Sequence, residues 1–191
     1  LACTGARNVG VGASALVANT TGSSNTAVGA FAGKALTTGG DNVAIGYDAL
    51  IAQTTSSGIV AIGRDALKAN TTGTECTAVG YKALEANTTQ SSNTAFGYEA
   101  LKSATNANNN TAIGRKTLSL NVGADRNVAV GDYALYNLNH ASADTFNVAV
   151  GNNALYETTT GDQNVAVGYD ALKENTTGAV NNAFGAYALD A

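Results

Sequence analysis

Apolar and polar residues alternate in a pattern that repeats every 17 residues along almost the whole chain. Each unit contains a motif of Asn, Val or Thr, Ala, a large apolar residue and Gly, and successive marker glycines are 17 residues apart except for one step of 20 between Gly131 and Gly151. Because the apolar residues are mainly β-branched and the motif is bounded by Asn and Gly, it predicts one short strand per unit. The large apolar residues form the column Val11, Val28, Ile45, Ile62, Val79, Phe96, Ile113, Val130, Val150, Val167 and Phe184.

A second motif, x-x-Ala-Leu, follows nine of the eleven marker glycines, the exceptions being Gly29 and Gly114. Four units carry opposite charges at the second and fifth positions after the glycine, and a spacing of three makes such residues neighbours in a helical turn. This spacing favours a single helical turn, although a second strand is the alternative. An Asn-Thr-Thr-Gly segment or a relative of it then closes the unit as a turn. The four charge pairs are Asp65 with Lys68, Lys82 with Glu85, Glu99 with Lys102, and Asp170 with Lys173.

The length of the repeat selects the architecture. A unit of 17 residues is too short for a helical hairpin of about 34 residues, and it suits one coil of a solenoid whose coils bury their apolar sides by stacking. We therefore predict a mainly all-β chain, a parallel β-solenoid or β-roll of eleven coils that forms one domain over residues 1–191. Because the chain starts at Leu1 without an initiator Met, we expect it to be a fragment of a longer fibrous protein.

Charge is absent from the predicted strands. All 10 basic and 14 acidic residues lie outside the motif from Asn to Gly and outside the Ala-Leu pair. A strand with one face in water would normally carry some charge on that face. Both faces of the strand column are therefore expected to be covered, one by the coil's own Leu column and the other by sister chains. The pattern predicts a homo-oligomer.

The unit Asn-Thr-Ala-Val-Gly-Tyr-x-Ala-Leu-x-x-Asn-Thr-Thr-Gly is seen nearly whole at 77–89 and 164–178. It resembles the shaft repeats of bacteriophage tail-fibre proteins that end in an endosialidase-type self-cleaving chaperone. Its Ala-Val-Gly core also resembles, more distantly, the head repeats of trimeric autotransporter adhesins, which are left-handed parallel β-rolls with a shorter repeat. The resemblance implies a homotrimer and an extracellular place on a virion tail fibre or a cell surface.

Composition excludes several functions. A net charge of −4 with only 13% charged residues gives no basic surface for nucleic acid, and no apolar run is long enough to insert in a membrane. The single histidine, His140, excludes multi-histidine zinc sites, and no nucleotide-binding or nucleophile motif is present. We expect no enzyme, no cofactor and no metal.

Recognition is expected at two places. The 20-residue unit carries three extra residues and the only histidine, and insertions in solenoids become loops that often bind partners. The candidate receptor-binding residues there are Tyr136, Asn139, His140 and Asp144. The tyrosines that follow marker glycines are expected to cover the Leu column, and the alternative is that their rings stack on sugars. These are Tyr47, Tyr81, Tyr98 and Tyr169.

Three functions fit the repeat. The first is a structural fibre shaft that attaches to a host-surface glycan or protein, and the second is a self-assembling extracellular filament or surface-layer subunit. The third is an ice-binding solenoid, suggested by stacked threonines such as Thr37, Thr54 and Thr71. A single outward threonine column is a poor match to ice, because neighbouring residues on a strand point in opposite directions.

Overall fold

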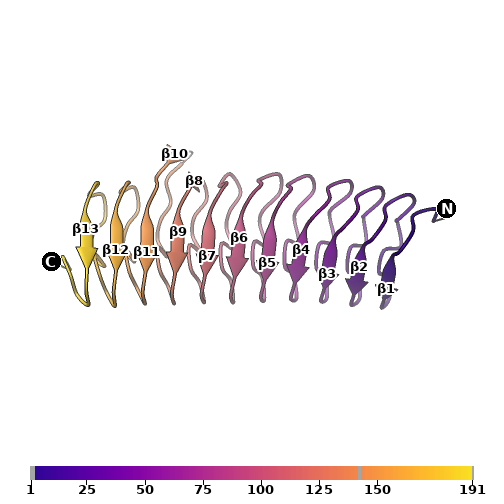
Figure 1. Ribbon diagram of the computed structural model, residues 1–191, viewed down its shortest axis with the longest axis horizontal. Helices are drawn as coiled ribbons and strands as arrows, with labels where there is room; N and C mark the ends of the chain where they lie inside the picture. Colours follow the sequence, from indigo (N-terminus) through magenta and orange to yellow (C-terminus); the bar gives the residue numbers. More distant parts are fainter. Residues whose placement is uncertain (1–2, 142, 191) are drawn as a thin grey trace.

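The computed structural model describes residues 3–141 and 143–190, and it is a parallel β-solenoid (Figure 1). Eleven strands form one parallel sheet whose order follows the chain, and the remaining two form a small second sheet. The described residues contain no helix. The large sheet comprises β1 (Val9–Val11), β2 (Thr26–Val28), β3 (Val43–Ile45), β4 (Val60–Ile62), β5 (Thr77–Val79), β6 (Thr94–Phe96), β7 (Thr111–Ile113), β9 (Val128–Val130), β11 (Val148–Val150), β12 (Val165–Val167) and β13 (Asn182–Phe184). The small sheet pairs β8 (Ala124–Asp125) with β10 (Ala143–Asp144).

Each strand residue pairs with its counterpart one unit along the chain. In β6 and β7 the partners are Ala95 with Ala112 and Phe96 with Ile113. The 20-residue unit keeps this register, since Ala129 of β9 still pairs with Ala149 of β11. The three extra residues are therefore absorbed outside the large sheet.

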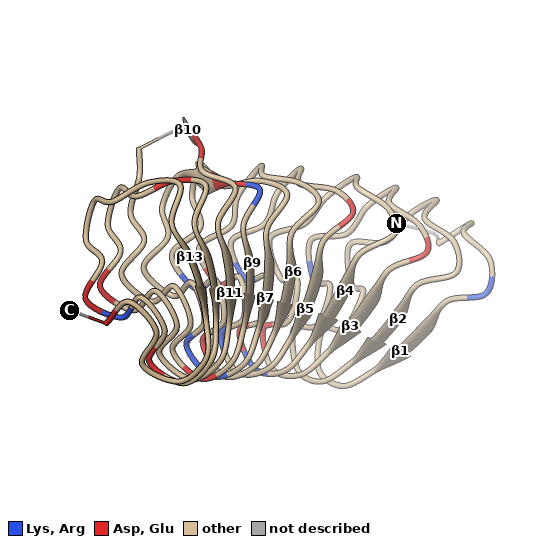
Figure 2. Ribbon diagram, turned by 60° about the vertical axis from the view of Figure 1, so that its left-hand side comes forward, with Lys and Arg blue, Asp and Glu red and all other residues tan. Residues whose placement is uncertain are grey.

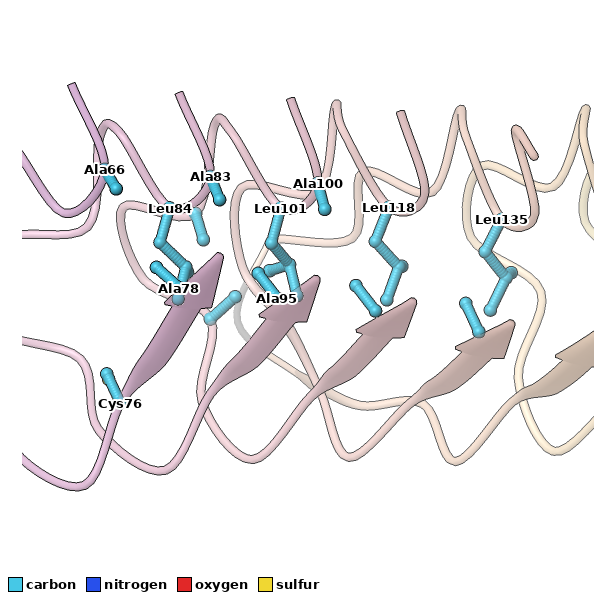
Figure 3. Packing of buried hydrophobic residues seen from close by; sticks show 14 of the residues in the cluster. Ala66, Cys76, Ala78, Ala83, Leu84, Ala95, Ala100, Leu101, Leu118 and Leu135 are labelled. Atoms are coloured by element: carbon cyan, nitrogen blue, oxygen red, sulfur yellow. The ribbon is translucent and has the colours of Figure 1, made fainter. Parts of the chain in front are cut away.

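The core lies between the sheet and the x-x-Ala-Leu segment. In the large sheet, the central Ala of every strand from β2 to β12 is almost fully buried, and Leu side chains from the opposite side of the coil reach it. Figure 3 shows this packing for Leu84, Leu101 and Leu118, which point toward the strands and the alanines at Ala78 and Ala95. A small residue facing a large one fills the narrow interior without voids.

The predicted helical turn is wrong, because the x-x-Ala-Leu segment is a series of β-turns. Asp65 and Leu67 have φ of 60° and 49°. The Ala66 N–H donates to the Gly63 carbonyl three residues back (3.3 Å), as in a type II turn. The Asp65 and Leu67 N–H groups donate to Tyr47 of the preceding coil and Ala83 of the following coil. Hydrogen bonds between coils thus replace the bonds that a helix would make within itself.

The marker glycines are required by close stacking. Gly46 has φ of +132°, and a Cβ there would lie 2.6 Å from both the carbonyl carbon and the carbonyl oxygen of Gly63. A side chain at this corner meets both an unfavourable backbone conformation and the neighbouring coil. Only glycine lets the coils approach to sheet spacing here.

Asparagines at the start of the strands form a buried ladder. The Asn110 N–H donates to Oδ1 of Asn93 (3.0 Å), and the Asn110 side-chain Nδ2 donates to the Ala124 carbonyl (3.0 Å) across the same coil. The same two bonds recur at Asn42 and Asn164. Asn is replaced at Ile59 and Cys76, where the ladder is interrupted. This ladder satisfies backbone groups that the buried turn would otherwise leave unpaired.

Candidate functional site

The outward side chains of the large sheet form an apolar surface, which we call the strand face. It consists of the first and third residues of the eleven strands, whereas the middle alanine points inward. Figure 2 shows that the strands of the large sheet carry no Lys, Arg, Asp or Glu. Several side chains of the strand face are exposed, with Phe96 at 55% and Phe184 at 71%.

The predicted column of large apolar residues lies on this face and not in the core. None of its members from Val28 to Phe184 is buried, and Ile113 is 40% exposed. Neighbouring coils do not enclose these side chains, because the strand alternation turns Ala112 inward and Ile113 outward. The inner face of the strand packs on the Leu column as expected.

The opposite side of each coil carries most of the charge, and we call it the turn edge. It comprises the first six residues after each marker glycine. All four predicted charge pairs form ion pairs, at 2.9 Å for Lys68 with Asp65, 3.1 Å for Lys82 with Glu85, 3.3 Å for Lys102 with Glu99 and 3.9 Å for Lys173 with Asp170. A β-turn brings residues three apart as close as a helical turn does, so the pairs form without a helix.

The tyrosines that follow marker glycines lie on the turn edge. Tyr47, Tyr98 and Tyr169 are exposed, and Tyr81 stacks on Tyr98 with ring centroids 5.2 Å apart. The neighbouring Leu column is fully buried at Leu84 and Leu101. These rings therefore cover part of the coil and still present ring surface to solvent.

A larger aromatic cluster lies nearer the C-terminus, and the sequence reasoning missed it. Tyr136 stacks on Tyr156 with centroids 5.4 Å apart and planes at 8°, and Tyr133 packs edge-on against both at 5.2 and 6.0 Å. The Arg115 guanidinium lies 4.8 Å from the Tyr133 ring centroid. These tyrosines occupy the second and fifth positions after the glycine, so aligning the units on those positions would have revealed them.

A hollow of about 300 Å³ opens beside this cluster. Tyr133, Asn153, Tyr156 and Lys173 line it. Burial raises the pKa of the Tyr156 phenol above its ordinary value, and the Glu157 carboxylate acts in the same direction. The phenol therefore stays protonated at neutral pH and can donate a hydrogen bond.

A second hollow, of about 430 Å³, lies at the open side of the last described coil. It is lined by Leu172, Leu189 and the Asn175–Gly178 turn, which are the groups that the next coil covers elsewhere in the stack. Its shape follows from the stacking geometry, and we do not treat it as a ligand site.

The four residues predicted in the insertion divide between two places. Tyr136 belongs to the aromatic cluster, and Asp144 lies in β10, the strand that projects from the stack in Figure 1. Asn139 and His140 precede that strand in the chain. Asp144 forms an ion pair with Arg126 of the neighbouring coil. The Asn139 N–H donates to the Thr159 carbonyl (3.0 Å), which ties the segment before β10 to the next coil. Ser142 of the insertion lies outside the described residues.

Stacked threonines form a ladder and not a free hydroxyl array. Thr20 Oγ1 donates to the Thr37 carbonyl (3.1 Å), Thr37 Oγ1 to the Thr54 carbonyl (3.0 Å) and Thr71 Oγ1 to the Thr88 carbonyl (3.1 Å). These hydroxyl protons are committed to the next coil.

Other chemistry finds no support in the described residues. They contain no group of three or more His, Cys, Asp or Glu placed to hold a metal ion, and both cysteines are free, with Cys3 exposed and Cys76 buried. Burial raises the pKa of the Cys76 thiol. No helix among them has the length and apolar character to cross a membrane.

No protein-family model, curated protein or solved structure matches the chain.

Proposed function

We propose that the chain is a shaft segment of an extracellular fibre, a homotrimer that attaches to a host or cell surface as a phage tail fibre or adhesin does. The observation that carries the proposal is the strand face, an uncharged and mainly apolar surface along the whole sheet, in which only Thr26, Thr77, Thr94, Thr111 and Asn182 are polar. An apolar patch of this kind often marks a functional contact surface. The chains that cover it are sister copies.

The shape of the strand face supports a side-by-side arrangement of the copies. Eleven strands spaced about 4.8 Å apart make a strip about 50 Å long, and two outward residues per strand make it only about 10 Å wide. Such a strip offers roughly 500 Å² to one partner, below the roughly 800 Å² per partner of a standard interface. Copies that run side by side along the fibre bury all of it, and closure about a central axis lets each copy meet two others. That three copies associate is inferred from the resemblance of the repeat to those of phage tail fibres and trimeric adhesins.

The threonine ladder does not favour the ice-binding alternative, because its hydroxyl protons are committed to neighbouring carbonyls. The strand face itself alternates Val and Thr with large residues such as Phe96 and Phe184. These rings interrupt the flat, regular surface that matching an ice lattice requires.

Light scattering on the purified chain tests the proposal. We expect three times the chain mass of 19.0 kDa at micromolar concentration. A stable monomer would overturn the proposal, and an open-ended series of larger masses would support the filament instead.

A matched pair of variants locates the interface. Ile113 on the strand face and Leu120 on the turn edge are both aliphatic and both 40% exposed. Ile113→Asp places an unpaired carboxylate in the proposed contact and should give a folded monomer, whereas Leu120→Asp should remain a trimer. Equal masses for the two variants would show that association does not use the strand face.

A further inference from the structure

We propose that the hollow beside Tyr133 and Tyr156 binds one neutral pyranose unit of a surface glycan. The proposal gives a partner to the attachment role of the proposed fibre and rests on that role. It places recognition on the turn edge of the coils near the C-terminus, away from the strand face and outside the segment from Asn139 to Asp144.

The tyrosines supply the stacking surface. Tyr136 supports Tyr156 from one side with nearly parallel planes, and Tyr133 packs edge-on against both rings. Rings held in this way lose little freedom when a ligand binds. The C–H face of a pyranose is apolar and matches the face of a phenol ring, while its hydroxyls stay at the rim. A hollow of about 300 Å³ is at the small end of ligand sites, which suits a single sugar ring.

A fixed polar group lies next to these rings. Asn153 Nδ2 donates to Oδ1 of Asp170 at 2.8 Å, and the Asp170 side chain is only 8% exposed. This bond orients the Asn153 amide, whose Oδ1 has no hydrogen-bond partner among the described residues. That oxygen can accept from a sugar hydroxyl, in the manner of the few placed polar groups that orient ligands in such sites.

The charges around the hollow select a neutral sugar. Lys173 Nζ lies 3.9 Å from Oδ2 of Asp170 and 3.7 Å from Oε1 of Glu174. One ammonium therefore faces two carboxylates. Arg115 and Lys116, which lie over the Tyr133 ring, are paired with Asp132 and Glu99. Each of these three cations at the hollow faces a carboxylate within the described part of the chain, which disfavours an acidic sugar. The lysine can still donate to a hydroxyl, because an ammonium has three N–H donors.

Tyrosine fluorescence of the intact chain gives a direct readout, since the chain has eight tyrosines and no tryptophan. The probes are cellopentaose, maltopentaose, chitopentaose, mannotetraose and galactotetraose, each titrated to about 10 mM. At least one should give a saturable change with a dissociation constant near 1 mM, the range of about −4 kcal/mol expected for one sugar ring on one platform.

Three variants assign the change to the hollow. Tyr156→Ala should weaken binding at least about 10-fold, and Tyr156→Phe should keep it within about 3-fold because the ring remains. Tyr98→Ala is the matched control, since Tyr98 belongs to a stacked pair of similar geometry outside the hollow. Asn153→Ala, which leaves the rings in place, should weaken binding as well and keeps the test valid if Tyr156→Ala does not fold.

The outcomes separate this site from the fibre itself. Absence of saturation with all five probes, or equal affinity for the chain and for both Tyr156→Ala and Asn153→Ala, would overturn the sugar site. Light scattering on the same samples reports the trimer independently. A trimer that binds no sugar overturns only the site, and a monomer that binds sugar overturns only the fibre.

Discussion

The strand face and the turn edge belong to the same coils and share one repeat, yet they accept very different residues. The first position after the marker glycine is occupied by Tyr47, Arg64, Asp132 and Asn152, among others. The third strand position accepts only Val, Ile or Phe. The outer positions of the turn edge are variable because their side chains meet water and one another, whereas its Ala-Leu pair is buried. The third strand position is uniform although this chain alone leaves it partly exposed, and this uniformity supports the proposed association of copies through the strand face.

The largest expected effect separates the two sides of one strand. Ala112 is fully buried and its neighbour Ile113 is exposed. Ala112→Asp buries a carboxylate without a partner and should lower the free energy of unfolding by at least about 3 kcal/mol. Ile113→Asp should leave the secondary structure of the coil intact. Circular dichroism with thermal melting checks both, and a collapse of both variants would show that the outward column is needed for the fold of the single chain.

The second-largest loss of stability is expected at the marker glycines, which lie between the strand face and the turn edge. Gly46→Ala places a methyl group against the Gly63 carbonyl at positive φ and should cost about 2–4 kcal/mol. Gly58 also has positive φ (+72°), but a Cβ there meets nothing within 4 Å. Gly58→Ala should therefore cost only about 1 kcal/mol. Similar melting temperatures for the two variants would contradict the close stacking of marker glycines.

A substitution in the buried asparagine ladder is expected to stabilise the fold. Cys76 Sγ lies 3.4 Å from the Gln90 carbonyl, the acceptor that an asparagine at this position would use. Cys76→Asn should restore that bond and offer Oδ1 to the Asn93 N–H. A gain of about 1 kcal/mol corresponds to a melting temperature higher by about 2–4 °C. Cys76→Ser, which is too short to reach both partners, is the control, and an equal gain for the two would remove the ladder as the cause.

The smallest effect is expected on the turn edge. Glu99 contacts Lys102 at 3.3 Å and Lys116 at 3.9 Å. Glu99→Gln should lower the free energy of unfolding by less than about 0.5 kcal/mol, because both lysines remain partly in solvent and the amide oxygen can still accept from Lys102. Chemical denaturation at low and high salt measures this loss. A loss above about 1 kcal/mol would mean that the Glu99 ion pairs are not screened by solvent.

Much of the fold was predictable because the repeat states the same pattern eleven times. The marker glycines placed every strand of the large sheet, and the spacing of three predicted four of the ion pairs. The β8–β10 pair and the ion pairs between coils, such as Arg115 with Asp132, were not predicted. The β-turns of the x-x-Ala-Leu segment were not predictable, because a spacing of three brings Asp65 and Lys68 into contact in a β-turn as well as in a helix. The Tyr133 cluster was not predicted because Tyr133 and Tyr136 lie in different columns of the repeat. The stacking of coils brings both rings against Tyr156.

The sequence by itself determined the period, the place of each strand of the large sheet, the absence of charge from these strands and the need for glycine at the corner, since these features are local and repeated. The tertiary structure alone decided which way the strand residues point, and it set Ala inward and Ile outward. It also decided that Leu67 and its equivalents adopt positive φ, a conformation that leucine rarely takes by itself. The physical reason is that hydrogen bonds to the coils on both sides outweigh the local preference, and such bonds do not exist until the coils stack.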